Sequence, residues 1–464
     1  MVQLYNYIIK FRKNESEDCF YYIFEICFIN STCRKNHMEL RQIQQEKFSK
    51  EQNATCFAII MITFVAAIFG SSMNLLGPII GKEFNVSASM LGWIMTSFTI
   101  GVAILAIPFG RLADMVGKKR IFVPGVLIFS VFSLMPIFVQ SFAMMLVFRI
   151  FQAIGGAMFF STTTAIIANV FPEGKRGKAV GLMIASMYVG LTVGPICAGA
   201  MNYYFGWRSM FMLAFALSIV AFVIALKKIP KDREIIEKLN VNILKDIAYV
   251  FKFFAGNFVY ASLNIIALIA SGVGFAIVYL MSIYLQIVMG YSSQTAGFVL
   301  IAQAIFMTAF SPYAGKLSDK VSPFKLSALG IAICATGVGL GVFININYPV
   351  WLVILALSIS GVGFGLFGPS NTIAVMSCVE IKDYGTASAV LVTMRYFGYS
   401  STVAVVSLIA GIYMGNIPLA DADIDLLIMT MRASFIVFLI LCTIGLLLSV
   451  KCSKHSSKEK SSSI

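Results

Sequence analysis

Apolar segments of about 20 residues recur along most of the chain, and they constrain its fold more than any other feature. A helix of about 20 residues crosses the roughly 30 Å hydrocarbon core of a bilayer, where each segment must satisfy its own backbone hydrogen bonds. Hydrophobic residues make up 59% of the 464 residues and charged residues only 12%, which excludes a soluble enzyme, a disordered chain and a nucleic-acid-binding protein. We therefore predict an all-α membrane protein with twelve transmembrane helices, at residues 57–80, 92–109, 121–139, 143–171, 179–204, 209–226, 258–288, 295–314, 325–343, 350–378, 386–413 and 432–450.

The distribution of positive charge predicts how these helices are oriented. The chain carries 35 Lys and Arg residues and a formal net charge of +14. If the N-terminus is cytoplasmic, thirty of these residues fall on the cytoplasmic side, and three (Lys82, Arg208 and Arg432) lie outside. Cytoplasmic loops of membrane proteins carry an excess of Lys and Arg. We therefore expect a multi-pass protein of the cell membrane with both termini in the cytoplasm.

The chain shows signs of an internal duplication. Shifts of 205 and 208 residues align pairs of identical residues: Gly92 with Gly297, Gly110 with Gly315, Asp114 with Asp319, Gly155 with Gly363, and Gly177 with Gly385. Parallel repeats related by an axis along the membrane normal are an architecture of secondary transporters. We expect two pseudo-symmetric six-helix halves that enclose a central cavity.

The spans and the charge pattern divide the chain into five parts. These are a cytoplasmic N-terminal segment (1–56), an N-terminal six-helix half (57–226), a central cytoplasmic loop (227–257), a C-terminal six-helix half (258–450) and a cytoplasmic tail (451–464). The central loop is basic and partly amphipathic, so we expect an interfacial helix on the inner leaflet. The composition changes at Met38, which is a candidate alternative start.

The loop after the second span carries the most specific motif. Residues 110–120 read GRLADMVGKKR and resemble, at nearly every defining position, the cytoplasmic signature of the major facilitator superfamily. A glycine at its start permits close helix packing, its Asp can pair with a basic group or cap a helix across the halves, and its basic end can anchor to the inner leaflet. A degenerate second copy follows the eighth span; the simpler alternative is a basic loop with an ordinary helix stop. The residues of this predicted gating motif are Gly110, Arg111, Asp114, Gly117, Lys118, Arg120, Gly315 and Asp319.

The fourth span contains an intramembrane arginine. Arg149 is followed by Gln152, Gly155 and Gly156, a pattern similar to a superfamily motif from which Ala153 departs. An arginine in hydrocarbon is costly unless it faces a cavity, backbone carbonyls or a partner, so we expect Arg149 to face the central cavity as a candidate for substrate binding or coupling. The alternative is that it extends to the outer surface, since it lies near the start of its span.

The fifth span contains a run of small residues around a proline. Gly190, Gly194, Pro195 and Gly199 resemble the motif of the superfamily's antiporters, in particular its drug exporters. Small residues and a proline suit close approach and bending, which we expect at the interface between the halves. Segments 284–300 and 385–395 are similar to the drug:proton antiporter branch, which usually has fourteen spans rather than twelve. This resemblance implies an exporter.

The acidic residues do not fit that branch completely. None of the 21 Asp and Glu residues lies in the middle of a predicted span, and Phe69 occupies the position at which fourteen-span antiporters usually carry an Asp. Proton coupling would then use peripheral acids such as Glu83 or Asp114, or the carrier uses another route. A central cavity without carboxylates, and with arginines nearby, suits neutral or anionic compounds better than cations. Its candidate polar residues are Asn74, Arg149, Gln152, Gln303, Asn371 and Arg395.

These observations together predict a secondary transporter rather than an enzyme. The sequence has no nucleotide-binding loop, nucleophile triad, CxxC pair or cluster of metal ligands, so we expect no cofactor and no metal. We expect a proton-coupled, multidrug-efflux-like antiporter that exports small amphiphilic compounds. The alternatives are an uncoupled or otherwise coupled carrier of a neutral or anionic metabolite and, third, a membrane sensor without transport. The expected partners are a small-molecule substrate, protons and lipids, without nucleic acid, and the expected state is a monomer.

Overall fold

A computed structural model describes residues 48–84, 88–230, 254, 256–291, 293–414 and 423–462. All of these residues except Phe48 belong to one compact unit, Ser49–Ile464. Met38 and residues 231–253 of the predicted central loop lie outside the described residues. The side chain of Asn74 also lies outside them.

This unit is built from long helices that correspond to the predicted spans. The N-terminal half contains α4 (Lys50–Glu83), α5 (Ala88–Val116), α6 (Lys118–Leu134), α7 (Phe142–Val170), α8 (Glu173–Phe205) and α9 (Arg208–Lys228). The C-terminal half contains α11 (Phe258–Ile283), α12 (Ser293–Ser318), α13 (Pro323–Val342), α14 (Val350–Ser377), α15 (Tyr384–Met414) and α16 (Ile424–Ser462). Short helical turns at Met135–Phe138, Tyr284–Val288 and Ile381–Asp383 extend α6, extend α11 and precede α15.

Within the described residues, 12 helices are long and apolar enough to cross a membrane, which confirms the twelve predicted spans. The last helix continues to Ser462, through most of the segment that we predicted as a tail.

Polar residues and glycine define where several helices begin. Ser49 accepts a hydrogen bond from the backbone N–H of Gln52, whose side chain in turn accepts from the Ser49 N–H. Asn257 accepts from the N–H of Tyr260 at the start of α11. Such caps satisfy N–H groups that have no partner in the first helical turn. Gly117, of the predicted gating motif, lies between α5 and α6 with φ of 106°, which other residues rarely adopt.

The two halves repeat the same close helix contact. A Cβ atom built on Gly155 of α7 would lie 2.6 Å from the Gly125 carbonyl of α6, and one on Gly363 of α14 would lie 2.7 Å from the Gly330 carbonyl of α13. Backbones approach this closely only where no side chain intervenes. The pairs are related by the 205 and 208-residue shifts found in the sequence, so the duplication extends to helix packing.

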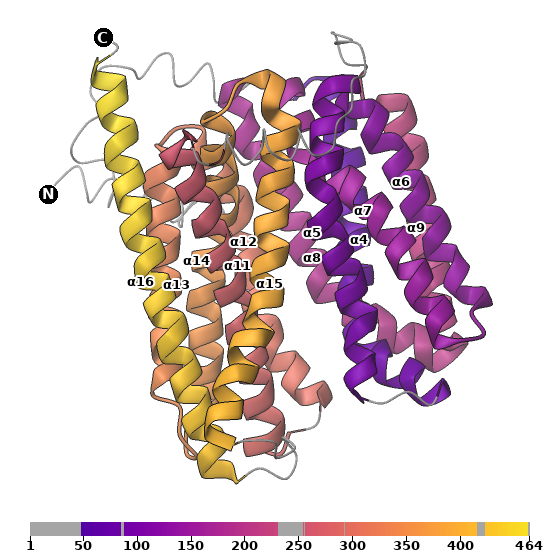
Figure 1. Cartoon of the computed structure of the whole chain (residues 1–464), viewed down its shortest axis with the longest axis vertical. Coiled ribbons are helices and arrows are strands. Elements are labelled where there is room, and N and C mark those ends of the chain that lie inside the picture. Colours follow the sequence, from indigo (N-terminus) through magenta and orange to yellow (C-terminus); the bar gives the residue numbers. More distant parts are fainter. Residues whose placement is uncertain are drawn as a thin grey trace, which may run out of the picture. The chain divides into compact units, whose positions relative to one another are not determined.

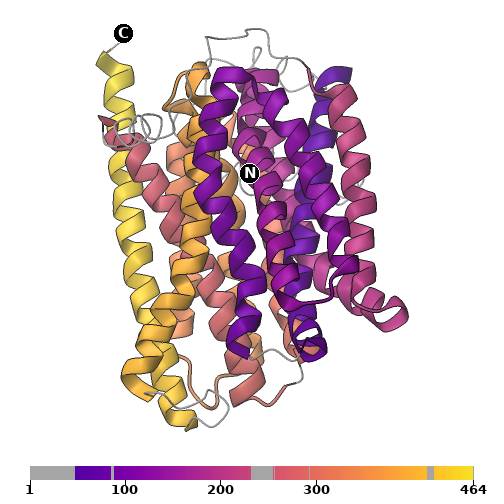
Figure 2. The ribbon, with the colours of Figure 1, turned by 45° about the vertical axis from the view of Figure 1, so that its right-hand side comes forward.

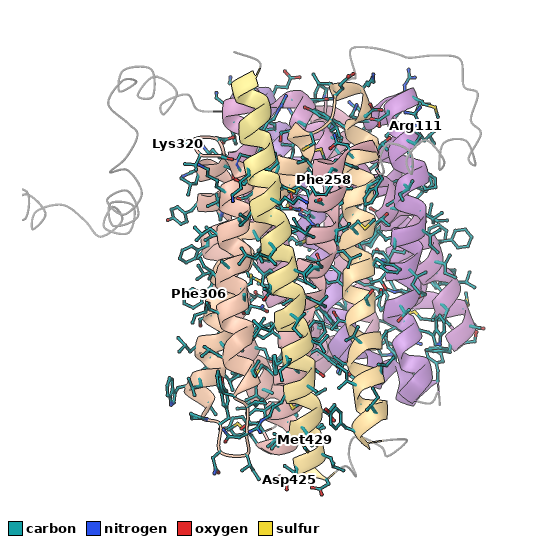
Figure 3. The ribbon with its side chains drawn as sticks, turned by 60° about the vertical axis from the view of Figure 1, so that its left-hand side comes forward. Arg111, Phe258, Phe306, Lys320, Asp425 and Met429 are labelled. Atoms are coloured by element: carbon teal, nitrogen blue, oxygen red, sulfur yellow. The ribbon has the colours of Figure 1, made fainter. Side chains whose placement is uncertain are left out.

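The halves meet mainly through four helices. Helix α5 packs beside α15, and α8 packs beside α12 (Figures 1 and 2). Helices α7 and α8 also contact α15 and α14, respectively. Figure 3 shows Arg111 and Lys320 at one end of the bundle and Asp425 and Met429 at the other. The polar contacts between the two halves are concentrated toward the end of the bundle that carries Arg111.

Candidate functional site

Asp114 of α5 caps the first turn of α15 in the other half. Its Oδ1 accepts a hydrogen bond from the Gly385 N–H at 2.7 Å, and its Oδ2 accepts from the Thr386 N–H at 2.7 Å and the Thr386 hydroxyl at 2.8 Å. Lys118 lies 3.5 Å from Oδ1, and the Asp114 side chain is only 2% exposed. A carboxylate at a helix N-terminus satisfies free N–H groups and interacts favourably with the helix dipole. We call Asp114, Gly385 and Thr386 the first latch.

Asp319, just after α12, makes the matching contact with α8. Its Oδ1 accepts from the Gly177 N–H at 2.7 Å and its Oδ2 from the Lys178 N–H at 3.0 Å. Burial outweighs these bonds and the nearby charge of Arg176, and raises the pKa of Asp319 to about 6. We call Asp319, Gly177 and Lys178 the second latch, and the end of the bundle that carries both latches the latch end.

Pairs of glycines allow the latches to form. A Cβ on Gly110 would lie 2.6 Å from the Gly385 carbonyl, and a Cβ on Gly315 would lie 2.1 Å from the Gly177 carbonyl. Both distances are too short for any residue with a side chain, so these helices touch backbone to backbone. The sequence predicts Gly110 and Gly315 as part of the gating motif but indicates no role for Gly177 and Gly385. The 208-residue shift that aligned them was the available signal.

Further contacts join the halves near the latches. Arg111 pairs with Asp383 at 3.7 Å, and Arg176 donates to the Tyr384 hydroxyl at 3.4 Å. Ser311 donates to the Gly181 carbonyl at 3.1 Å. An apolar cluster that includes Ala165 and Ala168 of α7 and residues of α11, α14 and α15 lies at the same end. The described inter-half contacts therefore hold the latch end closed.

The remaining basic residues of the gating motif have local partners. Lys119 donates to the Ile229 carbonyl at the end of α9, and Arg120 donates to the Val116 carbonyl at 3.4 Å. Arg120 is exposed at the latch end. The latch end is thus the side that the charge distribution predicts to be cytoplasmic.

Arg149 is held inside the N-terminal half and does not extend to the surface. It is 1% exposed and donates from Nε to the Ile94 carbonyl at 3.0 Å and from Nη1 to Gln152 Oε1 at 2.6 Å. The rings of Phe69 and Phe98 lie against the guanidinium, 5.2 and 4.9 Å from its carbon. Gln152 in turn donates to Ser133 at 2.7 Å. Backbone, amide and aromatic groups therefore stabilise this charge, as an intramembrane cation requires.

Arg395 of α15 lies between the halves. Its Nη2 donates to the Thr372 hydroxyl at 2.7 Å and to the Gly368 carbonyl at 3.4 Å, both on α14. The Tyr188 hydroxyl of α8 comes within 3.1 Å of the position that a Cβ on Gly368 would occupy. Arg395 and a tyrosine of the opposite half thus approach the same turn of α14.

The other predicted polar residues have separate surroundings. Asn371 is fully buried, and neither its amide nitrogen nor its amide oxygen has a hydrogen-bond partner among the described residues. Gln303 donates to Ser360 at 3.3 Å within the C-terminal half. The structure therefore does not join all predicted candidates in one cluster.

The small-residue motif of α8 lies elsewhere than expected. We expected Gly190, Gly194, Pro195 and Gly199 at the interface between the halves. A Cβ on Gly194 would lie 2.0 Å from Ser71 Oγ, and one on Gly190 would lie 2.7 Å from the Phe64 carbonyl, so these glycines pack against α4 of the same half. Gly190 and Gly194 let α8 approach α4, whereas another part of α8 carries Gly177, Gly181 and Tyr188 to the C-terminal half.

Every acidic residue in the described ranges lies at or near a helix end. Glu83, at the end of α4 opposite the latches, accepts from Trp207 Nε1 at 2.5 Å and from Arg208 Nη2 at 2.8 Å. These hydrogen bonds hold the pKa of Glu83 below its usual range. Glu83 therefore contacts only its own half, whereas Asp114, Asp319 and Asp383 are the described carboxylates that contact the opposite half.

Comparisons with known proteins agree with this architecture. A family model described as Major Facilitator Superfamily matches residues 58–403. The riboflavin transporter RibZ of Clostridioides difficile (strain 630) is 24% identical over 452 residues, which covers 88% of this chain and 99% of RibZ. The multidrug efflux pump LfrA of Mycolicibacterium smegmatis is 22% identical over 389 residues, which covers 73% of this chain and 77% of LfrA.

A solved structure shares the fold. The crystal structure of the human organic anion transporter MFSD10 (TETRAN) matches with a TM-score of 0.70 at 11% identity, over 87% of this chain and 100% of that chain. This likeness, together with the twelve helices, confirms the predicted fold class.

Proposed function

The chain belongs to the Major Facilitator Superfamily and is a secondary transporter, and we propose that it exports small amphiphilic organic compounds by alternating access. The observation that carries this proposal is the pair of latches. In the first latch Asp114 caps the start of α15, and in the second Asp319 accepts hydrogen bonds from backbone N–H groups in the second turn of α8. Because each latch joins the two halves, rocking of the halves must break both contacts together. A carrier that alternates between two such states exposes a midplane site first to one side of the membrane and then to the other.

The direction and coupling follow from the orientation that we predict. With the latch end cytoplasmic, the closed latches correspond to a state that receives or releases substrate on the outer side. The likeness of the α8 motif to that of antiporters favours export. Asp319 titrates within the second latch, so we propose that protons act on the transport cycle there rather than at the midplane.

A second candidate function is an uncoupled or otherwise coupled carrier of a neutral or anionic metabolite. Two intramembrane arginines and the lack of a midplane acid among the described residues favour such a substrate over a cation. The relative RibZ is named as a riboflavin transporter, and riboflavin is therefore a useful test compound. A membrane sensor that transports nothing is the third alternative.

Efflux from proteoliposomes tests these alternatives. Vesicles with purified protein are loaded with a panel of dyes, organic anions and riboflavin, and efflux is measured with and without a pH gradient. Asp114→Asn places an NH₂ group against the N–H donors of α15. An unsatisfied buried donor costs about 1–3 kcal/mol, so we expect the substitution to slow efflux about 5 to 150-fold. Asp425→Asn, at the exposed opposite end, is the matched control and should leave the rate unchanged.

Each outcome separates the candidates. Efflux that follows the pH gradient supports a proton-coupled exporter, whereas efflux of anions or riboflavin that ignores the gradient supports the metabolite carrier. If no compound moves, or if Asp114→Asn and Asp425→Asn behave alike, the transport proposal through the latches is wrong.

A further inference from the structure

Arg395 lies deep in the membrane-spanning part of α15. It follows the first residue of the helix, Tyr384, by eleven positions, which at about 1.5 Å per residue places it roughly 16 Å along the helix. This depth is near the middle of a hydrocarbon core about 30 Å thick. A cation at such a depth needs a partner or an aqueous path, and it marks a functional site more often than a structural one.

The guanidinium of Arg395 is only partly engaged. Its Nη2 bonds to Thr372 and Gly368, but Nε and Nη1 have no partner among the described residues. The side chain is half-buried, and none of the described carboxylates forms an ion pair with it. Arg149, by contrast, is fully buried and has its Nε and Nη1 bonded and aromatic rings against the guanidinium. Arg395 therefore keeps donors and charge available for a ligand.

Side chains of the N-terminal half lie close to the residues around Arg395. Tyr188 of the N-terminal half reaches the same turn of α14 to which Arg395 donates. The next residue, Tyr396, lies with its ring 5.9 Å from the ring of Phe160, which belongs to α7 of the N-terminal half. Groups from both halves thus meet next to Arg395, as a site that alternates between two sides requires.

Aromatic rings extend the site along α15. The ring of Tyr396 lies 5.9 Å from that of Tyr399 in an edge-to-face arrangement, and the Tyr399 ring lies 6.3 Å from that of Phe275 on α11. Tyr396 and Tyr399 are half-buried and so keep part of their surface free. Flat aromatic surfaces favour planar aromatic ligands by stacking and edge contacts.

We propose that Arg395, Thr372 and the rings of Tyr188, Tyr396, Tyr399 and Phe160 form the binding site for a planar aromatic organic anion. The guanidinium receives a carboxylate, sulfonate or phenolate group through its free N–H donors, and the tyrosine and phenylalanine rings contact the ring system. An arginine presents a planar array of donors that matches such anionic groups. The inference rests on the proposed function, because it specifies the substrate class of the transporter.

Equilibrium binding to the full chain in lipid nanodiscs tests this inference without requiring transport. Fluorescein at pH 8 is a planar xanthene dianion, and rhodamine 123 has the same ring system with a positive charge. Fluorescence anisotropy should show fluorescein binding at least about tenfold more tightly than rhodamine 123 to the wild type. This preference is measured without any substitution and therefore does not depend on the folding of a variant.

Substitutions then assign the preference to Arg395. Arg395→Gln should weaken fluorescein binding about tenfold or more, the loss expected for a charge-assisted hydrogen bond, and should not weaken rhodamine 123 binding. Arg395→Lys keeps the charge but loses the planar donor array, so it should weaken fluorescein binding less. Arg432→Gln, an arginine outside the site, is the matched control and should bind both dyes as the wild type does.

Two results would overturn the proposal: equal binding of the two dyes to the wild type, or fluorescein binding to Arg395→Gln within about twofold of the wild type. The outcomes also separate this inference from the proposed function. Efflux that depends on Asp114 but not on Arg395 would leave the exporter intact and refute the anion site. Fluorescein binding that depends on Arg395, in a protein that moves no compound, would support the site and refute transport.

Discussion

Replacing Gly177 by alanine should shift the transporter away from the state in which the latch end is closed. A Cβ on Gly177 would lie 2.0 Å from the Gly315 carbonyl and 2.6 Å from Asp319 Oδ1. Real Cβ atoms essentially never come closer than 3.0 Å to another heavy atom, so the carbonyl must move by about 1 Å. Both neighbouring groups are constrained, one by the backbone of α12 and the other by its hydrogen bonds.

The size of the effect follows from that displacement. The hydrogen bonds of Asp319, now 2.7 and 3.0 Å long, would lengthen by about 1 Å and pass beyond hydrogen-bonding distance. A hydrogen bond to a charged group contributes about 1.5–3 kcal/mol. Two such bonds would be lost, but water hydrates Asp319 in the open state and compensates for part of that loss. We therefore take about 1.5–3 kcal/mol for the latch, which changes the ratio of closed to open states roughly 10 to 150-fold. The higher helix propensity of alanine acts on both states alike and cancels.

Distance measurements between spin labels detect this shift. Labels at Arg120 and Lys320, introduced through an unnatural amino acid, lie in exposed positions on opposite halves at the latch end. Double electron–electron resonance should show a larger population with a long distance between the two labels in the Gly177→Ala variant than in the wild type. Gly339→Ala, in α13, is the matched control, because a Cβ there meets no atom within 4 Å.

A specific result would refute this reasoning. If Gly177→Ala and Gly339→Ala give the same distance distribution as the wild type, then close backbone contact at Gly177 does not control the closed state. The thermal unfolding of both variants is measured as well, so that a shift in distance is not mistaken for loss of structure.

Three further predictions concern titration and buried charge. Burial raises the pKa of Asp319 to about 6, above that of a hydrated carboxylate, so the state with the latch end closed binds the proton more tightly than the open state does. Lowering the pH from 7.5 to 5 should therefore increase the population with a short distance between the spin labels, and Asp319→Asn should remove this pH dependence. Glu83→Gln should leave the pH dependence of efflux unchanged, because hydrogen bonds from Arg208 and Trp207 hold the pKa of Glu83 below its usual range and keep it ionised at pH 5 and above; a changed efflux profile would contradict this. Arg149→Ala leaves two buried acceptors, the Ile94 carbonyl and Gln152 Oε1, without their donor, at a cost of about 1–3 kcal/mol each. It should therefore lower the unfolding temperature of the purified protein more than Arg395→Gln does.

Sequence alone determined the membrane class and the spans of this protein. A bilayer accepts only long apolar helices, so composition and length were sufficient to locate them, and a count of Lys and Arg was sufficient to predict their orientation. The motif around Asp114 was recognisable because its residues are close together in the chain. Repeats such as Gly110 and Gly315 were visible for the same reason, since a constant shift aligns them.

Only the tertiary structure decided which groups these residues contact. The carboxylates of Asp114 and Asp319 accept hydrogen bonds from backbone N–H groups 271 and 142 positions away in the sequence. Every residue except proline has a backbone N–H group, so the residue types in a sequence do not reveal such a donor. For the same reason the small residues of α8 were assigned to the wrong interface, since Gly190 and Gly194 could have faced either half. The difference between Arg149 and Arg395 likewise depends on neighbours from several helices. Helix formation in a membrane follows from local composition, whereas helix pairing depends on the fit of distant surfaces.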